Sequence, residues 1–269
     1  MKKIRFDEER TFGVEIEVTD SYNYSRESIA AKIREKGIEA LSEGWNHQTR
    51  LYWKVTTDGS CGLEIVSPIL KGQSGLQAIN TVCEALNEVG CKVNKKCGLH
   101  VHHGVADYTI KNFKNLFKMY TKYEEGLDQV VPESRRADTA TYCGTMIINQ
   151  NVHSTLEKIE ACKTVSEIEG LYCSRYKKLN CQSYVKYGTL EFRQHSGTTD
   201  AVKIINWVKL TQFMITKATI STTKSNLDGK NDLYWLLSML GARVSATWTE
   251  DTKEIASYYK ARAKALAVA

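Results

Sequence analysis

The 269-residue sequence contains only two prolines, Pro68 and Pro132, and it has no low-complexity segment or internal repeat. A proline-rich linker between domains is therefore excluded. No apolar run reaches the roughly 18 residues that a membrane-spanning helix needs. The first residues are charged and lack the apolar region of a signal peptide. These absences predict a globular protein of the cytoplasm with no membrane partner.

The eight cysteines include no C-x-x-C pair. This absence argues against a thioredoxin-like or zinc-ribbon site, and thiols in the cytoplasm are expected to be reduced. Cys83 falls on an apolar helical stripe and is expected in the core. Cys97 stands beside a His-x-His segment, so Cys91, Cys97, His100 and His102 form an alternative zinc set.

The sequence also lacks a block of basic residues interleaved with aromatic residues. Its formal net charge of +6 is mild. Such a charge suits an anionic substrate, for example a nucleotide phosphate, and it also suits weak contact with nucleic acid. Nucleic-acid binding is therefore disfavoured but stays open.

Four short segments alternate apolar and polar residues in the manner of half-buried strands. In residues 13–18, Glu15 and Glu17 share one face while Val14, Ile16 and Val18 share the other. Residues 63–66, 99–103 and 190–195 follow the same pattern. The polar faces of the four segments carry Glu15, Glu17, Glu64, His100, His102, Glu191 and Arg193.

A single sheet with these polar faces on one side would bring the seven side chains together. Such a concentration of charge is costly to bury without a metal ion. Carboxylates with one or two imidazoles suit Mg²⁺ or Mn²⁺, and an arginine among them suits a phosphate. The alternative is that these strands face solvent and the acids aid solubility.

Periodicity elsewhere indicates an α+β fold with an antiparallel or mixed sheet, helices on one face and the polar site on the other. We expect helices at 26–41, 75–89, 109–130 and from Asp200 onward, and two short helices within 154–173. We expect a strand at 51–57, a loop at 131–152 and a hairpin of 179–186 with 189–195. Two final helices follow, the first ending at Gly241 and the second opened by a Thr247-x-x-Glu250 capping box. We assign residues 1–225 to one catalytic domain and 226–269 to a helical extension packed on it.

Five motifs in a fixed order carry a family resemblance. They are Gly13-x-Glu15-x-Glu17; Asp58-Gly59-Ser60 with Glu64-Ile65-Val66-Ser67-Pro68; Cys97-Gly98-Leu99-His100-Val101-His102; Arg175-Tyr176-x-x-Leu179-Asn180; and Gly188-Thr189-x-Glu191-Phe192-Arg193. Together they resemble the amidoligase family, carboxylate-amine ligases distantly similar to glutamine synthetase and glutamate-cysteine ligase. The resemblance spans roughly residues 12–210 and leaves the C-terminal tail uncovered.

The resemblance implies a curved, mostly antiparallel sheet of the glutamine-synthetase catalytic-domain type, with helices on its outer face and with ATP and divalent metal on its concave face. Glu15 and Glu17 resemble the paired metal ligands of the first strand. Glu64 resembles the acidic ligand near the substrate end, and we also count it as a catalytic residue. His100 resembles the imidazole ligand, and Glu191 the metal ligand of the last motif.

The remaining candidates concern nucleotide and substrate. His102 is similar to a second histidine nearer the nucleotide phosphates, and Arg193 resembles the arginine that meets the transferred phosphoryl group. Arg175 and Asn180 are candidates for binding ATP phosphate or the acyl substrate. His195 continues the face of Glu191 and either touches substrate or is merely hydrogen-bonded. Residues expected to be structural or at the surface are His103 and His153.

The expected reaction is ATP- and Mg²⁺-dependent amide formation through an acyl phosphate, since a carboxylate does not react with an amine unless it is activated. Phosphoryl transfer needs its charge neutralised by metal ions and an arginine. One alternative is a metal-dependent hydrolase that uses the same Glu/His cluster with Zn²⁺. A second is a non-enzymatic nucleic-acid-binding protein. The sequence does not name the acid or the amine.

Overall fold

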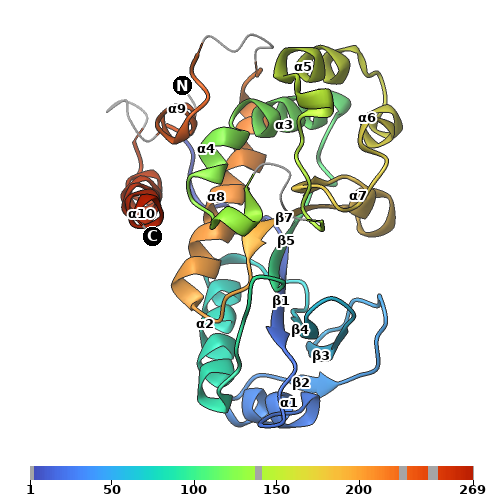
Figure 1. Cartoon of the computed structure of the whole chain (residues 1–269), viewed down its shortest axis with the longest axis vertical. Helices are drawn as coiled ribbons and strands as arrows, with labels where there is room; N and C mark the ends of the chain where they lie inside the picture. The colour runs from blue at the N-terminus through green and yellow to red at the C-terminus, as the bar shows by residue number, and fades with distance from the viewer. Residues whose placement is uncertain (1–2, 137–140, 224–228, 242–247, 269) are drawn as a thin grey trace. The chain divides into compact units, whose positions relative to one another are not determined.

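The computed structural model describes residues 3–136, 141–223, 229–241 and 248–268. The chain divides into two compact units (Figure 1). The sheet unit comprises residues 7–104 and 195–208. The helical unit comprises residues 1–6, 105–194 and 209–269. The chain passes between the units four times, and each unit is therefore built from segments that are distant in sequence.

Five strands form the sheet of the sheet unit, in the order β2-β3-β4-β1-β5. Their bounds are β1 (Phe12–Thr19), β2 (Ala40–Ser42), β3 (Trp53–Asp58), β4 (Gly62–Val66) and β5 (Gly98–Gly104). The pairs β1–β4, β1–β5 and β3–β4 are antiparallel, whereas β2 and β3 are parallel. The short Asp58–Gly62 turn joins β3 to β4, as expected for an antiparallel hairpin.

One face of this sheet is apolar and packs into the core of the unit. Val14, Ile16 and Val18 of β1 are at most 1% exposed. Helices α1 (Arg26–Glu35) and α2 (Gly72–Val89) pack against each other. A Cβ on Gly75 of α2 would lie 2.9 Å from Cζ of Phe12, so α2 crosses β1 too closely for any side chain at that position. Helix α2 therefore covers the apolar face.

Local signals set the ends of these two helices. Ser25 caps α1, and its hydroxyl accepts a hydrogen bond from the N–H of Ser28 in a capping box. Gly90 ends α2 in the left-handed conformation, at φ 84°. The prediction of a helix at 26–41 is wrong beyond Glu35. The chain turns at Gly37 (φ 83°), and residues 40–42 form β2 instead.

The helical unit holds most of the remaining elements. Their bounds are α3 (Ile110–Lys122), α4 (Glu124–Asp128), η1 (Glu133–Arg135), η2 (Ile148–Gln150), α5 (Val152–Ala161), α6 (Val165–Tyr172), β6 (Leu179–Asn180), α7 (Gln182–Tyr187), β7 (Thr189–Ser196), α8 (Ala201–Ile220), α9 (Leu233–Met239) and α10 (Glu250–Ala267). The boundary between the units falls near the end of β7 and within α8. Helix α3 packs against α5 and α6, and α4 packs against α9.

Two predictions for this part of the chain are wrong. The helix expected at 109–130 is broken at Tyr123, where φ −106° and ψ 15° leave the helical region, so α3 and α4 are separate. The hairpin expected from 179 to 195 keeps only a two-residue first strand, because α7 follows it. The side chain of Asn180 accepts a hydrogen bond from the N–H of Gln182 (2.9 Å), and this local bond turns the chain away from the ladder.

The C-terminal helices belong to the helical unit. Helix α10 begins after Thr249, which forms a capping box with Thr252. The expected box at Thr247-x-x-Glu250 differs from this, and Thr247 itself lies outside the described residues. The side chain of Asp251 accepts a hydrogen bond from the N–H of Phe6 (2.9 Å). The assignment of 226–269 as an extension of a 1–225 domain stays a prediction.

The architecture is thus mixed α+β with a mostly antiparallel sheet, as the sequence predicts. The expected loop at 131–152 contains the short turns η1 and η2, and residues 137–140 within it lie outside the described part. Among the described residues, no helix is both long enough and apolar enough to cross a membrane.

Candidate active site

The polar face of the sheet carries ionisable side chains in register across neighbouring strands. Glu15 of β1 pairs with His100 of β5, and Glu17 of β1 pairs with Glu64 of β4. Directly paired residues point to the same side of a sheet. His102 lies two residues beyond His100 on β5 and shares that side. These five side chains therefore occupy one face, in agreement with the alternation of each strand.

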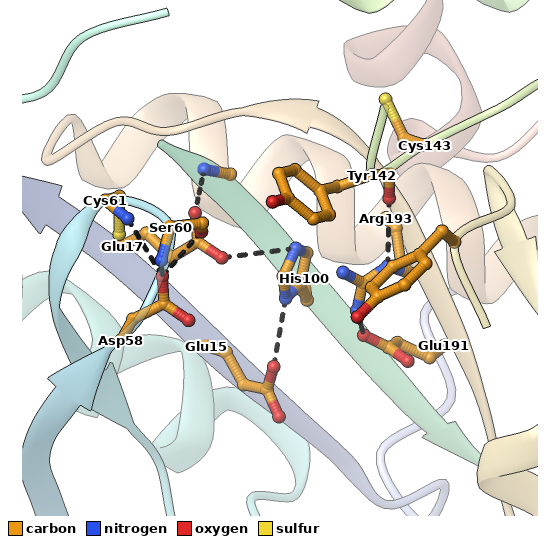
Figure 2. Close-up of polar contacts among 12 residues, drawn as sticks. Glu15, Glu17, Asp58, Ser60, Cys61, His100, Tyr142, Cys143, Glu191 and Arg193 are labelled. Atoms are coloured by element: carbon orange, nitrogen blue, oxygen red, sulfur yellow. Dashed lines mark hydrogen bonds and ion pairs between the residues drawn. The ribbon is translucent and has the colours of Figure 1, made fainter. Parts of the chain in front are cut away.

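His100 lies between the two glutamates of β1 (Figure 2). Its Nδ1 is 3.0 Å from Oε2 of Glu15, and its Nε2 is 3.6 Å from Oε1 of Glu17. His102 approaches the other oxygen of Glu15, at 3.3 Å. The N–H of Gly98 donates a hydrogen bond to Oε2 of Glu17 (2.5 Å). The two carboxylates are thus held apart and oriented by imidazole and backbone groups.

The carboxyl groups of Glu15 and Glu64 have opposite pKa shifts. Burial alone would raise the pKa of Glu15, but its hydrogen bonds to His100 and His102 outweigh burial and hold the pKa well below its usual value. Burial raises the pKa of Glu64 well above its usual value, and the negative charges of Glu15 and Glu17 raise it further. Without a cation, Glu64 therefore tends to keep its proton.

This arrangement suits a divalent cation. Glu15, Glu64 and His100 each offer one ligand atom, and the three atoms lie within 4.8 Å of one another. Two carboxylates with one imidazole fit Mn²⁺ or Mg²⁺. A cation would also remove the repulsion that keeps Glu64 protonated. The donor set therefore fits the predicted metal site.

Replacing Glu64 by glutamine is expected to stabilise the metal-free protein at neutral pH. The pKa of Glu64 is raised in the folded chain, so this group lowers the free energy of unfolding as pH rises through the raised pKa. Glu64→Gln should remove that loss and also the stabilisation by added Mn²⁺ or Mg²⁺. Melting temperatures measured from about pH 5 to 8, with EDTA or with metal, check this. A variant stabilised by metal as much as the parent would contradict it.

A second group of polar side chains lies in the helical unit. Asn180 donates a hydrogen bond from Nδ2 to Oε2 of Glu191 (2.6 Å). Nη1 of Arg193 bonds to the other oxygen of Glu191, and Nε of Arg193 donates to the carbonyl of Tyr142 at 3.3 Å. Glu191 is 5% exposed. Arginine and amide together neutralise and orient this buried carboxylate.

Two exposed tyrosines stand beside this group. The rings of Tyr142 and Tyr176 meet edge to face, with centroids 5.2 Å apart. The guanidinium of Arg175 lies 5.0 Å from the centroid of Tyr176, and that of Arg193 lies 5.9 Å from it. Arg175 is exposed, and it therefore remains a candidate contact for an anionic ligand.

The predicted site residues thus fall into two groups. The sheet unit gathers Glu15, Glu17, Glu64, His100 and His102, and the helical unit gathers Asn180, Glu191 and Arg193 beside Arg175. Asn180, expected to bind phosphate or substrate, holds Glu191 in this structure. That the two groups serve one site stays a prediction.

The other histidines have structural surroundings. His103 lies on the apolar face and is fully buried, and burial lowers its pKa to about 3. His153 is exposed, 3.2 Å from Glu157. His195 bonds through Nδ1 to the carbonyl of Ser196 (2.7 Å) and packs against Trp207. Of the alternative zinc ligands, Cys91 joins no cluster of metal-ligating side chains within the described ranges.

Sequence reasoning gave no role to Lys54 and Thr56 on this polar face, nor to Asp58 and Cys61, whose ligand atoms lie near that of Glu17. Of these four residues, only Asp58 stands in one of the five motifs. Alternation in β3 places Lys54, Thr56 and Asp58 on the side of Glu64, since Thr56 pairs with Glu64. The buried ammonium of Lys54 donates to the carbonyl of Asn46 (2.9 Å). The strand expected at 51–57 includes Lys54 and Thr56, and its alternation places both side chains on the same side of that strand.

The comparisons with known proteins bear on this site. The sequence matches the family model described as "Putative amidoligase enzyme" over residues 8–215. The chain therefore belongs to the amidoligase family, a family of ligases, and the resemblance carried by the five motifs is confirmed. No curated protein matches the sequence.

One similar solved structure is the crystal structure of the complex between prokaryotic ubiquitin-like protein Pup and its ligase PafA. The sequence identity is 9% and the TM-score is 0.45. The match covers 96% of this chain and 63% of that chain. The present chain thus spans less than two thirds of the length of the chain it matches.

Proposed function

We propose that the protein is an ATP- and Mg²⁺-dependent carboxylate-amine ligase that forms an amide bond through an acyl phosphate. The observation that carries the proposal is the Glu15–Glu64–His100 donor set in a member of the amidoligase family. Two carboxylates and an imidazole within 4.8 Å suit a divalent cation that binds nucleotide phosphates. We extend the proposal to a sheet of the glutamine-synthetase catalytic-domain type.

In this proposal the residues of the sheet unit hold the cation. A divalent cation supplies charge neutralisation for the transferring phosphoryl group. Glu15 is ionised and needs no proton loss to bind metal, whereas Glu64 gives up its proton when metal binds. His100 is oriented by its hydrogen bond to Glu15. His102 is assigned to the nucleotide phosphates; its Nε2 lies 3.3 Å from Oε1 of Glu15, whereas His100 contacts Oε2.

The residues of the helical unit are assigned to the phosphoryl group and its metal. Arg193 presents a guanidinium that neutralises charge on the phosphoryl group as it transfers. In this structure the guanidinium bonds to Glu191. A phosphate that draws Arg193 away would free one oxygen of Glu191 for a cation. Asn180 orients Glu191. Arg175 orients the anionic ligand.

The reaction then follows from ordinary carboxylate chemistry. A carboxylate oxygen of the acid attacks the terminal phosphorus of ATP, ADP leaves, and an acyl phosphate forms. The amine attacks the acyl carbon, loses a proton, and phosphate leaves. The buried positions of Glu191 and Arg193 keep their charges effective, since electrostatic interactions are stronger away from water.

ATP with Mg²⁺ is expected to raise the melting temperature. A ligand at 100 times its dissociation constant that binds only the folded state adds about 2.7 kcal/mol, which is roughly 5–11 °C for a chain of this size. Glu15→Gln should abolish the gain, because it removes the ionised ligand while keeping the shape of the side chain. Glu84→Gln, on the exposed side of α2, is the matched control.

Thermal shift measurements with Mg²⁺ or with EDTA decide the outcome. A gain of equal size in EDTA would refute a metal-bridged nucleotide. Release of ADP that depends on both an acid and an amine separates the ligase from a metal-dependent hydrolase, because a hydrolase needs neither ATP nor Arg193. A mixed panel of amino acids, peptides and polyamines is the starting set of substrates.

A further inference from the structure

A buried polar network lies on the core side of β7, and the proposed function does not use it. Leu190, Phe192 and Gln194 share that side of the strand by alternation, and all three are fully buried. Gln194 is the polar member of the three. Its Oε1 accepts a hydrogen bond from the hydroxyl of Tyr120 (2.5 Å), and its Nε2 donates one to Oδ1 of Asp128 (2.5 Å). Both polar atoms of the buried amide are therefore bonded.

The network closes a ring of contacts around the main chain of Arg193. Oδ1 of Asp128 also accepts a hydrogen bond from Nζ of Lys178 (2.7 Å). The carbonyl of Lys178 in turn accepts a hydrogen bond from the N–H of Arg193 (2.9 Å). Gln194 follows Arg193 in the chain, so the contacts return to their starting point. We call Asp128, Lys178, Arg193 and Gln194 the β7 ring.

The lysine of the β7 ring also ties the strand to the loop that receives the guanidinium of Arg193. Nζ of Lys178 donates to Oε1 of Glu124 (2.8 Å), and Oε2 of Glu124 accepts a hydrogen bond from the N–H of Met146 (2.8 Å). Figure 2 shows Arg193 bonded through Nε to the carbonyl of Tyr142, which lies in the same loop as Met146. The network therefore fixes both ends of this bond, the strand and the loop.

A polar side chain at this core position is costly, because burying an amide removes it from water. An apolar side chain like that of Phe192 would avoid the cost. Buried polar groups can, however, fix which of several alternative pairings a chain adopts. Within the helical unit β7 pairs with β6, which is only two residues long. A slip of one residue would turn the side chain of Arg193 to the core side, and the bonds of Gln194 oppose such a slip.

We propose that Gln194 is a positioning residue for Arg193 and acts through the β7 ring. The ring holds β7 in the register that lets the guanidinium reach the carboxylate of Glu191 and the carbonyl of Tyr142. Placement of the guanidinium is a property of the folded chain and is measurable without substrates. Its effect on turnover rests on the proposed function. Loss of the Gln194 amide is therefore expected to displace the guanidinium while the chain stays folded.

Gln194→Met is the test substitution, because methionine has a similar length but no amide. By itself this change leaves the hydroxyl of Tyr120 buried without its acceptor and should lower the melting temperature. The double variant Gln194→Met/Tyr120→Phe removes that hydroxyl as well and should recover much of the melting temperature. Tyr120→Phe alone is the matched control, because it leaves the bond from Gln194 to Asp128 in place.

The measurement is hydrogen exchange of the Arg193 Nε–H group by NMR, with the full-length protein and without nucleotide or metal. Arg193→Lys identifies the signal by removing it. In the double variant this group should exchange with solvent at least about tenfold faster, because its bond to the carbonyl of Tyr142 is opened more often. The Nε–H of Arg50, bonded to Glu43 at 2.9 Å in the sheet unit, should exchange at the parent rate.

Turnover separates positioning from a purely structural role. Acid-dependent release of ADP should stay at least about tenfold below the parent rate in the double variant, although its melting temperature recovers. The proposal is overturned if the Arg193 Nε–H of the double variant exchanges at the parent rate, if Tyr120→Phe speeds that exchange equally, or if the double variant turns over like the parent. Faster exchange together with a parent that releases no ADP supports the positioning role and refutes the proposed function alone.

Discussion

Arg193→Lys is expected to keep the stabilisation by ATP and Mg²⁺ but to lose at least about tenfold in turnover. A tenfold loss is about 1.4 kcal/mol of transition-state stabilisation. Lysine keeps the positive charge and loses the planar fork of guanidinium donors. In this structure the fork spans two acceptors, the carboxylate of Glu191 and the carbonyl of Tyr142. An ammonium cannot reproduce both contacts in one plane.

The measurement is acid-dependent release of ADP, with thermal shift as the separate measure of nucleotide binding. Arg262→Lys is the matched control, because the Nε of Arg262 likewise donates to a backbone carbonyl, that of Val130, at 2.7 Å. The control should turn over at the parent rate. If Arg193→Lys and Arg193→Ala both do so as well, Arg193 has no part in phosphoryl transfer.

Lys178→Met is expected to cause the largest loss of stability, about 3–5 kcal/mol. Lys178 is fully buried, and its ammonium is bonded to Glu124 at 2.8 Å and to Asp128 at 2.7 Å. Glu124 is 2% exposed and also accepts hydrogen bonds from Thr145 and from the N–H of Met146. Removing the ammonium leaves the buried carboxylate of Glu124 and the partly exposed carboxylate of Asp128 without their cation.

The position of Lys178 explains why this network matters for the candidate site. Its carbonyl accepts a hydrogen bond from the N–H of Arg193 (2.9 Å), and its N–H donates to the carbonyl of Gly144 (2.9 Å). Lys178 therefore joins β7, which carries Arg193, to the loop that carries Tyr142. A loss of the network should loosen the surroundings of Arg193 before the whole chain unfolds.

Urea-induced unfolding gives the measurement. Lys253→Met is the matched control, because the ammonium of Lys253 pairs with the exposed carboxylate of Glu250, and it should change stability by less than about 1 kcal/mol. The double variant Lys178→Met/Glu124→Gln should recover part of the loss, since it removes one of the unpaired charges. Equal stability of Lys178→Met and the parent would show that the buried pair contributes nothing.

Much of the candidate site was accessible from local sequence patterns. Alternation alone placed Glu15 with Glu17 and His100 with His102, because side chains of a strand alternate regardless of its neighbours. The boundaries of helices were less well predicted. Residues 40–42 form a strand where the end of a helix was expected, and the helix expected at 109–130 is interrupted at Tyr123. Turns and packing override helix propensity at both places.

The register between strands could not be predicted from the sequence. Whether Glu17 faces Glu64 depends on the pairing of β1 with β4, and only that pairing brings Asp58 and Cys61 to Glu17. The turn at Asn180 likewise replaced an expected strand by α7, through one side-chain hydrogen bond. The strand pairing joins residues that are distant in sequence, so no local periodicity predicts it. The Asn180 bond is local, but it competes with the ladder and the alternation of residues 179–186 does not reveal it.

The sequence by itself determined the amidoligase family, the alternating strands and the side chains available to the site. The tertiary structure alone decided which carboxyl groups keep a proton. Glu15 and Glu64 are the same residue type on adjacent strands, yet imidazoles lower the pKa of one while burial and nearby carboxylates raise that of the other. The reason is physical, because a pKa depends on the solvent and the charges around a group in space.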